Sequence, residues 1–332
     1  MKTIIKVAQF GLGPIGLECL RLAACKDWIR FVGAIDIAPD KVGADLGKVA
    51  GVASLRSMRI RASLDELEQK PDLVFHTAVS RFTAAYKQLE PIVARGINVV
   101  SSCEELLFPQ LSNSKLAAKL DRICRRSGAR LVGTGVNPGF VMDFLPLCLT
   151  TVSREVRAIH VQRVVNASTR REPLQRKIGI GLAPEEFQCR LQAGEAGHAG
   201  LKESLALIAH MLGWRTIKII ETGEPVVARR AIRTRYLQVR KGETCGLHQR
   251  AEAKVNGRTR LSLDLVMALD AENEHDAIQI EGDPPLSVVI EGGVAGDQAT
   301  VAALVNTAPR LLRAEPGLHF VTDLPIAPAM PE

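Results

Sequence analysis

The chain has 332 residues, of which 46% are apolar and 24% charged, and 43 Lys and Arg against 36 Asp and Glu give a net charge of +7. This composition excludes a disordered or fibrous protein, and the length predicts about two domains, each able to bury its own core. Aromatic residues make up only 4% of the chain, and none is interleaved with the arginine clusters as a base-stacking platform requires, so we expect no nucleic-acid partner.

The 7 cysteines are an odd number without a C-x-x-C pair, so the sequence predicts neither a disulfide framework nor a zinc site. The longest apolar stretch, residues 131–149, is interrupted by glycines, prolines and Asp143, which argues against a membrane span. The N-terminus lacks the long apolar region of a signal peptide. We therefore expect a reduced, cytoplasmic protein.

Strand-like runs alternate with helical patterns through the first part of the chain. The expected strands are residues 3–10, 30–36, 73–79, 97–102 and 130–136. This alternation predicts a parallel, doubly wound sheet of the Rossmann type, which we assign to a first domain of residues 1–136. One of its helices is expected from Ser112 or Ser114 to Arg126, with Gly128 ending it.

After about residue 150 the pattern changes to the period of two that is typical of half-covered strands. Residues 261–269 alternate in this way, and Asn256-Gly257 predicts a hairpin turn that joins them to a strand over 246–255. The other expected elements are strands over 155–166, 217–221, 234–240 and 277–281 and helices over 184–193 and 200–212. We expect residues 137–295 to form an α+β substrate and dimerisation domain with a mostly antiparallel sheet, and a helix and Pro-rich tail (296–332) to return to the first domain.

A glycine motif of the form G-x-G-x-x-G follows the first strand and opens a helix. Its members are Gly11, Gly13, Pro14, Ile15 and Gly16, with Leu12 between the first two glycines. In this context the motif predicts a dinucleotide site, with the pyrophosphate at the helix N-terminus; a merely structural turn is the alternative. Asp36, at the end of the next strand, favours NAD because it accepts hydrogen bonds from ribose hydroxyls, while the nearby Lys41 leaves NADP possible.

The carboxyl ends of the remaining strands are expected to line the same ligand. Thr77, Ala78, Ser80 and Ser101 are the candidates for contact with the cofactor. The pairs Ser101/Glu104 and Ser102/Glu105 both fit a capping box, so either glutamate is alternatively a helix cap. A glutamate not used in that way would accept a proton from a substrate ammonium or activate water.

Two histidines stand in different surroundings. His198 lies in a glycine-rich loop that enters a helix, which suggests a functional residue as readily as a structural one. His76 lies inside an apolar strand and is expected to be a core histidine. No cluster of His, Cys, Asp and Glu has the spacing of a metal site.

Several separated segments together resemble the family of 2,4-diaminopentanoate dehydrogenases and native amine dehydrogenases, whose N-terminal domain is similar to that of dihydrodipicolinate reductases. Those segments are residues 34–36, 41–43, 45–47, 102–106, 135–140, 173–175, 177–179, 197–198, 212–214, 305–309 and 316–318. The resemblance implies NAD(P)-dependent, reversible oxidative deamination of a primary amine, either 2,4-diaminopentanoate or a short aliphatic amine, to a ketone and ammonia.

The resemblance also implies a role for particular residues. It places the catalytic glutamate at Glu104, with Glu105 as the fallback. It places Asn137, Phe140, Asn166 and His198 in the substrate pocket, with Phe140 as an apolar wall. A substrate carboxylate would pair with Arg163, Arg170 or Arg171, whereas a simple aliphatic amine needs no such partner and these arginines are then a solvated surface. Analogy with related oxidoreductases suggests a homodimer formed through the antiparallel sheet.

Two alternatives remain open. The first is an NAD(P)-dependent reductase of the dihydrodipicolinate reductase type that acts on a hydroxyl, ketone or imine substrate. The paired histidines followed by a lysine that mark those reductases are not found in the sequence. The second alternative is a dinucleotide-binding sensor without catalysis.

Overall fold

The computed structural model describes residues 4–215, 217–326 and 329, and the chain divides into two compact units. Unit 1 comprises Met1–Gly139 and Ala295–Glu332, and unit 2 comprises Phe140–Val294. None of the helices in the described ranges is long and apolar enough to cross a bilayer.

Unit 1 is a parallel sheet covered by helices on both faces. Its strands are β1 (Ile5–Phe10), β2 (Ile29–Ile35), β3 (Ile60–Arg61), β4 (Leu73–His76), β5 (Asn98–Ser101), β6 (Arg130–Gly133) and β15 (Gly317–His319). Its α-helices are α1 (Pro14–Ala24), α2 (Leu46–Ala50), α3 (Phe82–Ala94), α4 (Pro109–Ser127) and α9 (Gly296–Leu311). Short 3-10 helices span Ala53–Leu55, Leu64–Glu66, Glu104–Leu107 and Val321–Asp323.

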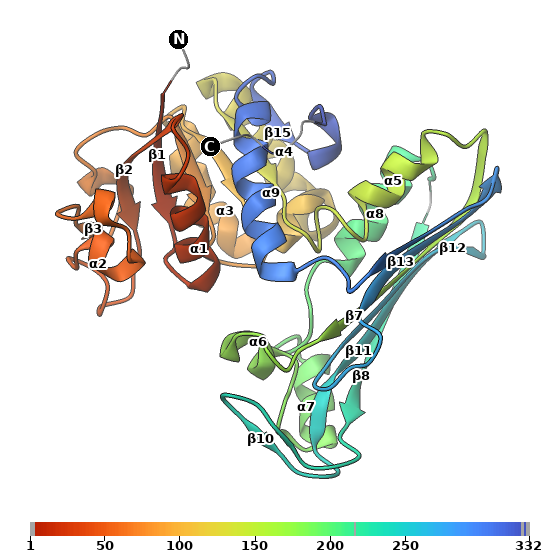
Figure 1. Ribbon diagram of the computed structural model, residues 1–332. Helices are drawn as coiled ribbons and strands as arrows, with labels where there is room; N and C mark the ends of the chain where they lie inside the picture. Colours follow the sequence, from red (N-terminus) through yellow and green to blue (C-terminus); the bar gives the residue numbers. More distant parts are fainter. Residues whose placement is uncertain (1–3, 216, 327–328, 330–332) are drawn as a thin grey trace. The chain divides into compact units, whose positions relative to one another are not determined.

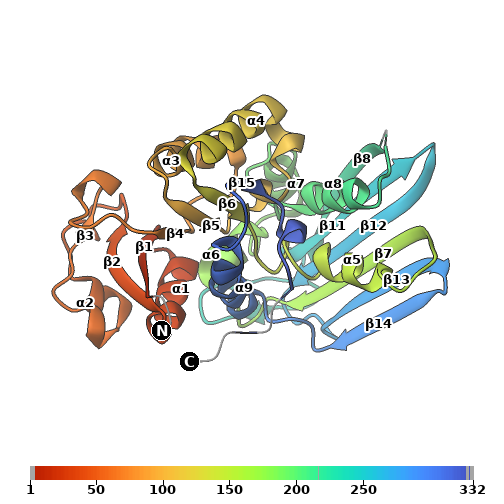
Figure 2. The same ribbon diagram turned by 90° about the horizontal axis from the view of Figure 1, so that it is seen from above.

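The strand order β15-β6-β5-β4-β1-β2-β3 confirms the doubly wound sheet. Helices α1 and α9 cover one face of this sheet, and α3 and α4 cover the other (Figures 1 and 2). The order reverses between β1 and β4, so the crevice at their carboxyl ends is where such a sheet binds its ligand.

Helix α4 shows how the sequence sets its own boundaries. Gly128 ends the helix in the left-handed conformation (φ +79°), as expected from the sequence. The helix begins at Pro109, earlier than the expected start at Ser112 or Ser114, and it has a kink at Asn113. The side-chain oxygen of Asn113 accepts the amide hydrogen bond of Leu116, so it caps the second part of the helix.

Unit 2 is built on a six-stranded sheet in the order β14-β13-β7-β12-β11-β8. The strands are β7 (Glu155–Asn166), β8 (Ile217–Val227), β11 (Thr244–Val255), β12 (Arg258–Ala268), β13 (His275–Asp283) and β14 (Leu286–Glu291). Its helices are α5 (Phe144–Thr150), α6 (Glu172–Lys177), α7 (Pro184–Gln192) and α8 (Leu201–Met211). Strands β7 and β12 pair in parallel and the other pairs are antiparallel, so the mostly antiparallel sheet is confirmed. The turn at Asn256-Gly257, with φ of +51° and +79°, joins β11 to β12 as predicted.

The expected strand over 234–240 was wrong. This segment instead folds into a small hairpin of β9 (Ile232–Arg233) and β10 (Gln238–Val239), outside the main sheet. The hydroxyl oxygen of Thr234 accepts hydrogen bonds from the amides of Tyr236 and Leu237, which turns the chain back where a strand would continue. Four expected strands of unit 1 extend beyond the observed carboxyl ends of β2, β4, β5 and β6. The sequence analysis did not predict β3, β14 or β15.

Two expectations fall partly outside the residues that the structure describes. Thr3 of the first expected strand lies outside them, and so do positions 327, 328, 330 and 331 of the Pro-rich tail.

A buried ion pair connects β7 and β13 to the end of unit 2. Arg163 Nη1 lies 2.6 and 2.7 Å from the two carboxylate oxygens of Asp276, and both side chains are almost completely buried. Arg163 Nη2 donates to the carbonyl of Val294, and the amide of Val294 donates to Asp276. Arg163 is therefore committed to a structural role, which corrects its candidacy as a partner of a substrate carboxylate.

We expect Asp276→Ala to lower the free energy of unfolding by about 3–5 kcal/mol, because it leaves the Arg163 charge buried without its counter-ion. The double substitution Arg163→Met/Asp276→Leu removes both charges and should recover most of that loss. Urea unfolding measures both effects. The control is Arg230→Ala, which breaks the exposed Arg230–Asp270 pair and should cost no more than about 1 kcal/mol. Equal losses for the buried and the exposed pair would contradict the assignment.

Candidate active site

The turn after β1 has the backbone geometry of a pyrophosphate-binding loop. Gly11 has a φ of +89°, which favours glycine. A Cβ on Gly16 would lie 2.0 Å from the carbonyl oxygen of Gly11, so only glycine lets α1 pack this close to the turn. A Cβ on Gly13, in contrast, would meet no atom within 4 Å. The first turn of α1 therefore opens onto free space at its positive end, as an anionic ligand requires.

Two polar side chains fasten this turn to the neighbouring strand. The Thr77 hydroxyl donates to the carbonyl of Gly11 at 2.9 Å. Gln9 Nε2 donates to the Thr77 hydroxyl and to the same carbonyl, at 2.9 and 3.1 Å. Thr77 thus lies at the switch point between β1 and β4, where we expected it to be. The sequence analysis did not single out Gln9. The signal that could have found it is a polar glutamine within an otherwise apolar strand.

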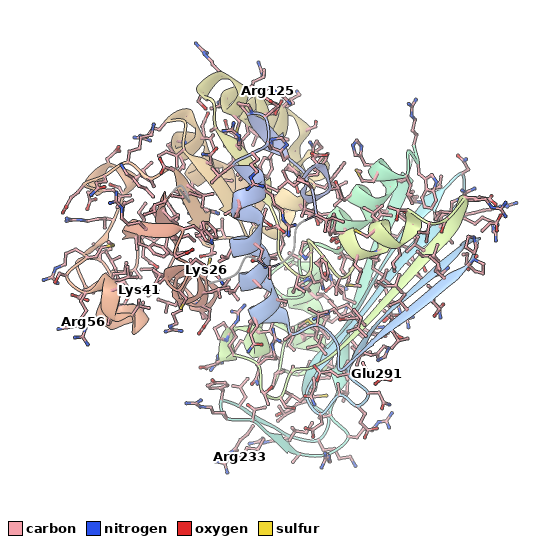
Figure 3. All side chains as sticks on the ribbon, turned by 45° about the horizontal axis from the view of Figure 1, so that its top comes forward. Lys26, Lys41, Arg56, Arg125, Arg233 and Glu291 are labelled. Carbon is pink, nitrogen blue, oxygen red and sulfur yellow. The ribbon has the colours of Figure 1, made fainter. Side chains whose placement is uncertain are left out.

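Asp36 lies at the end of β2, and three donors surround its carboxylate. The amides of Leu12 and Ala38 donate to it at 2.7 and 2.9 Å, and Lys41 Nζ lies 3.4 Å from Oδ2. Partial burial raises the pKa of Asp36, but the two amide hydrogen bonds and the Lys41 charge outweigh it and lower the pKa below its usual value. Figure 3 shows Lys41 on the segment between β2 and α2. The carboxylate is therefore ionised and oriented, with a cation beside it.

The three segments expected at the cofactor follow adjacent strands. His76 of β4 pairs with Ser101 of β5, and Ser101 pairs with Gly133 of β6, so the residues after these strands leave the sheet at one edge. Ala78 and Ser80 follow β4, and the Glu104 segment follows β5. A Cβ on Gly133 would lie 2.7 Å from the backbone of Leu106, so this glycine brings the end of β6 against the 3-10 helix that begins at Glu104.

Glu105 serves as a cap, but of a helix that the capping-box patterns did not indicate. Its carboxylate accepts hydrogen bonds from the amide of Phe82, at the start of α3, and from the Ser112 hydroxyl. It also pairs with Arg81 at 2.9 Å, and the residue is only 9% exposed. The N-cap of its own 3-10 helix is Cys103, which makes no side-chain cap bond, so neither expected serine–glutamate box forms there. Glu104, next to this cap, is partly exposed.

A buried polar chain holds the backbone that precedes Glu104. His76 bonds through Nε2 to Gln88 (2.8 Å) and through Nδ1 to the Ser101 hydroxyl (2.9 Å), which in turn accepts the amide of Cys103 (3.1 Å). Burial lowers the pKa of His76 to about 4, so the ring is neutral, and the expectation of a core histidine is confirmed. Ser101 is fully buried, and its hydroxyl is used inside this chain. Burial also raises the pKa of the Cys103 thiol, which excludes a ready thiolate nucleophile.

Asn137 follows β6 in unit 1. Its Oδ1 is buried without a hydrogen-bond partner among the described residues. A buried amide oxygen of this kind is costly unless a ligand donor satisfies it. Asn137 therefore fits a role in binding a donor such as a carboxamide or an ammonium group.

The unit 2 candidates lie on connected segments. Asn166 ends β7, and its Oδ1 accepts the amide of Ser168. Arg171 immediately precedes α6. Gln175, fully buried in α6, donates to the carbonyls of Ala167, Ser168 and Arg170 and accepts from the Thr234 hydroxyl. Gln175 thus ties the Asn166–Arg171 segment to the β9–β10 hairpin, on which Figure 3 labels Arg233. Sequence reasoning quoted this glutamine only as part of a family segment.

His198 lies in the loop before α8, as predicted. Gly194, Gly197 and Gly200 all have positive φ values, and the amide of Gly197 donates to the carbonyl of Lys177. The segments 177–179 and 197–198, which the resemblance quoted separately, are therefore neighbours in space. Phe140 begins unit 2, is 37% exposed, and has its ring 6.4 Å from that of Phe144.

No group of three or more His, Cys, Asp and Glu in the described ranges is arranged to hold a metal ion. An NAD(P) cofactor fits unit 1 on four observations. They are the open space at Gly13, the uncapped N-terminus of α1, the oriented Asp36 carboxylate and the orphan oxygen of Asn137. The doubly wound sheet with this turn is a Rossmann fold, and the second unit is an α+β unit built on a mixed, mostly antiparallel sheet.

Comparison with known proteins identifies the family. Residues 140–332 match the 2,4-diaminopentanoate dehydrogenase C-terminal domain, which is more than half of the chain. The protein therefore belongs to the 2,4-diaminopentanoate dehydrogenase family, whose members include dehydrogenases that act on amines.

Two curated relatives extend over nearly the whole chain. A 2,4-diaminopentanoate dehydrogenase of Acetoanaerobium sticklandii is 29% identical over 98% of this chain and 95% of its own length. An amine dehydrogenase of Streptomyces virginiae is 23% identical over 98% of both chains.

Solved structures show the same fold. An amine dehydrogenase from Mycobacterium smegmatis superposes with a TM-score of 0.86 at 23% identity, covering 97% of this chain and 96% of that one. The WlbA dehydrogenase of Bordetella pertussis, solved with NADH, gives 0.55 at 13% identity and covers 96% and 92%. Biliverdin reductase of Synechocystis, solved with NADP+, gives 0.53 at 12% identity and covers 87% and 79%.

The neutral His76 makes stability depend on pH. Its pKa is about 4 in the folded protein and near 6.5 in the unfolded chain, so only the unfolded chain takes up this proton between those values. His76 therefore opposes folding increasingly as the pH falls from 6.5 to 4, by up to about 3 kcal/mol, and has no such effect above pH 6.5.

We expect His76→Gln to lose less unfolding free energy between pH 7 and pH 4.5 than the wild type, although its stability at pH 7 is lower. Urea unfolding at a series of pH values measures the difference. His319→Gln, at a partly exposed histidine, is the control and should keep the wild-type pH dependence. Identical slopes for His76→Gln and the wild type would contradict a neutral, buried ring.

Proposed function

We propose that the protein is an NAD(P)-dependent amine dehydrogenase that catalyses reversible oxidative deamination of a primary amine to a ketone and ammonia. In the balanced reaction, the protonated amine, oxidised NAD(P) and one water give the ketone, an ammonium ion, reduced NAD(P)H and one proton. The observation that supports the proposal is the position of Glu104. It begins the segment that follows β5, at the edge of the sheet where β4, β5 and β6 end.

Glu104 is the proton-transfer residue in this proposal. A primary amine at neutral pH carries a proton that must leave before hydride can depart from its carbon. The nicotinamide of the bound cofactor supplies the hydride acceptor. The Glu104 carboxylate takes the ammonium proton and releases it to solvent. Ionised again, it accepts a proton from the water that adds to the iminium carbon, so one group serves both proton steps. Its negative charge also stabilises the cationic iminium.

Residues of unit 2 would then choose the amine. We propose Asn166 and His198 as polar contacts of the substrate and Phe140 as an apolar wall, and Asn137 separately as a further polar contact. Arg171 would recognise a substrate carboxylate by a charge-assisted hydrogen bond, which selects 2,4-diaminopentanoate over simple alkylamines. The 29% identity to a 2,4-diaminopentanoate dehydrogenase supports the diamino acid as the first substrate to test.

The homodimer also stays a proposal, supported by the sheet of unit 2. Helices α5, α7 and α8 pack on one face of this sheet (Figure 1). On β14 the side chain of Val289 is 58% exposed, and on β8 that of Ile220 is 38% exposed. We propose that the face of the sheet away from these helices pairs with a second copy.

The activity is tested by following the absorbance of NAD(P)H with 2,4-diaminopentanoate, short alkylamines and the matching alcohols, and in reverse with ketone plus ammonium. We expect Glu104→Gln to retain cofactor binding and to lose at least about a hundredfold in kcat, because glutamine cannot accept the proton. Glu18→Gln, an exposed surface change, is the control. Full activity in Glu104→Gln with loss in Glu105→Gln would move the role to Glu105. Turnover of alcohols without any amine would favour the alternative reductase.

Lys41 supports a second prediction, on the choice of cofactor. Asp36 binds ribose hydroxyls and repels a 2′-phosphate, but the Lys41 ammonium beside it offsets that repulsion. We therefore propose that NAD is preferred and that NADP is tolerated because of Lys41.

Lys41→Met should weaken binding of NADPH by about tenfold or more, while binding of NADH changes by no more than about threefold. Quenching or enhancement of NAD(P)H fluorescence measures both affinities without turnover. Lys48→Met, on nearby α2, controls for net charge. Equal weakening of NADH and NADPH would contradict a role in recognition of the phosphate.

A further inference from the structure

A buried side chain holds the main chain of His198. Gln249 of β11 accepts the amide hydrogen of His198 at its Oε1 and donates through Nε2 to the carbonyl of His198, both at 2.9 Å. The residue is 5% exposed. Both backbone groups of His198 are therefore paired with one side-chain amide, in the manner of a strand neighbour.

A third hydrogen bond fixes the orientation of that amide. Gln249 Nε2 also donates to Glu221 Oε1 at 2.8 Å, so both of its N–H groups are used and the oxygen must face the amide of His198. Glutamate at this position could not donate, and it would place a second carboxylate against Glu221. Methionine has a similar length and would make none of these bonds.

The contact continues into the helix that the loop enters. Glu221 on β8 pairs with Lys202, in the first turn of α8, at 3.0 Å. On the other side, a Cβ on Gly197 would lie 2.6 Å from Leu191 of α7. The loop is thus confined between α7, the start of α8 and the polar group of Gln249.

We propose that Gln249 is a positioning residue for the amine-dehydrogenase reaction, holding the main chain of His198 so that its imidazole contacts the substrate. This inference rests on the proposed function, in which His198 is a substrate contact. A glycine-rich loop has little conformational preference of its own. Hydrogen bonds from other segments must therefore hold its backbone if the imidazole is to keep a fixed position. Gln249 itself touches no reacting atom.

The test is a double-substitution cycle with His198→Ala, Gln249→Met and the double variant, assayed for the KM of the amine and of NAD+. We expect Gln249→Met to raise the amine KM by about ten- to a hundredfold and to leave the NAD+ KM within about twofold. In the His198→Ala background the same change should have little further effect, because both substitutions remove one contact. Gln69→Met, at an exposed glutamine of unit 1, is the control.

A measurement without turnover keeps this inference separate from the proposed function. Hydrogen exchange of peptides covering residues 194–200 should be faster in Gln249→Met and unchanged in Gln69→Met, whether or not an amine is oxidised. If the wild type oxidises no amine but the loop still loosens, the proposed function fails and the clamp on the His198 backbone stands. Additive kinetic effects, an equal rise in both KM values, or unchanged exchange of the loop would each overturn the proposal for Gln249.

Discussion

The close approach of two backbones at the start of α1 is the constraint on which unit 1 depends. Gly16 can lie against the Gly11 carbonyl only because it has no side chain, and that carbonyl is also the acceptor for Thr77 and Gln9. One oxygen therefore links the turn after β1, the first turn of α1 and the end of β4. These are the three elements that meet at the switch point, so the contact that packs α1 against the sheet also shapes the turn where we propose that the cofactor binds.

The acidic residues near this edge of the sheet are distinguished by what their oxygens already bind. Asp36 accepts two amides and lies beside Lys41, so its charge is held in one orientation. Glu105 accepts the first amide of α3, the Ser112 hydroxyl and an Arg81 hydrogen bond, which makes it a part of the framework. Its hydrogen bonds hold the start of α3 against the 3-10 helix that begins at Glu104. Glu104 begins the segment that follows β5, next to this residue, and its proposed acid–base role rests on that position.

Much of this architecture is readable from the sequence because it depends on local patterns. The glycine spacing, the position of Asp36, the alternation in β12 and the turn at Asn256-Gly257 each follow from periodicity or from a conformational requirement of one residue type.

The wrong predictions also have physical causes. The capping-box patterns at Ser101 and Ser102 were local, but Glu105 caps a helix that begins 23 positions earlier in the chain. The strand expected over 234–240 has suitable side chains, yet the Thr234 hydroxyl competes for the backbone amides that a sheet would use. Arg163 looks like a substrate ligand until the fold brings Asp276 to it from β13.

Buried glutamines recur wherever an irregular segment must be held against regular structure. Gln9 donates hydrogen bonds to the glycine turn and to Thr77, and Gln175 donates to three carbonyls near Arg171. Gln249 pairs with both backbone groups of His198. Each acts on loop backbone that lacks strand or helix partners, where an unpaired amide or carbonyl would cost more than the hydrogen bond itself contributes. Glutamine suits this task because one uncharged side chain supplies two donors and an acceptor, without the desolvation penalty of a buried ion. A single sequence cannot reveal such pairings, because Gln249 and His198 come together only when α8 folds onto the sheet. Residues that position a site are therefore harder to predict from sequence than residues that line it.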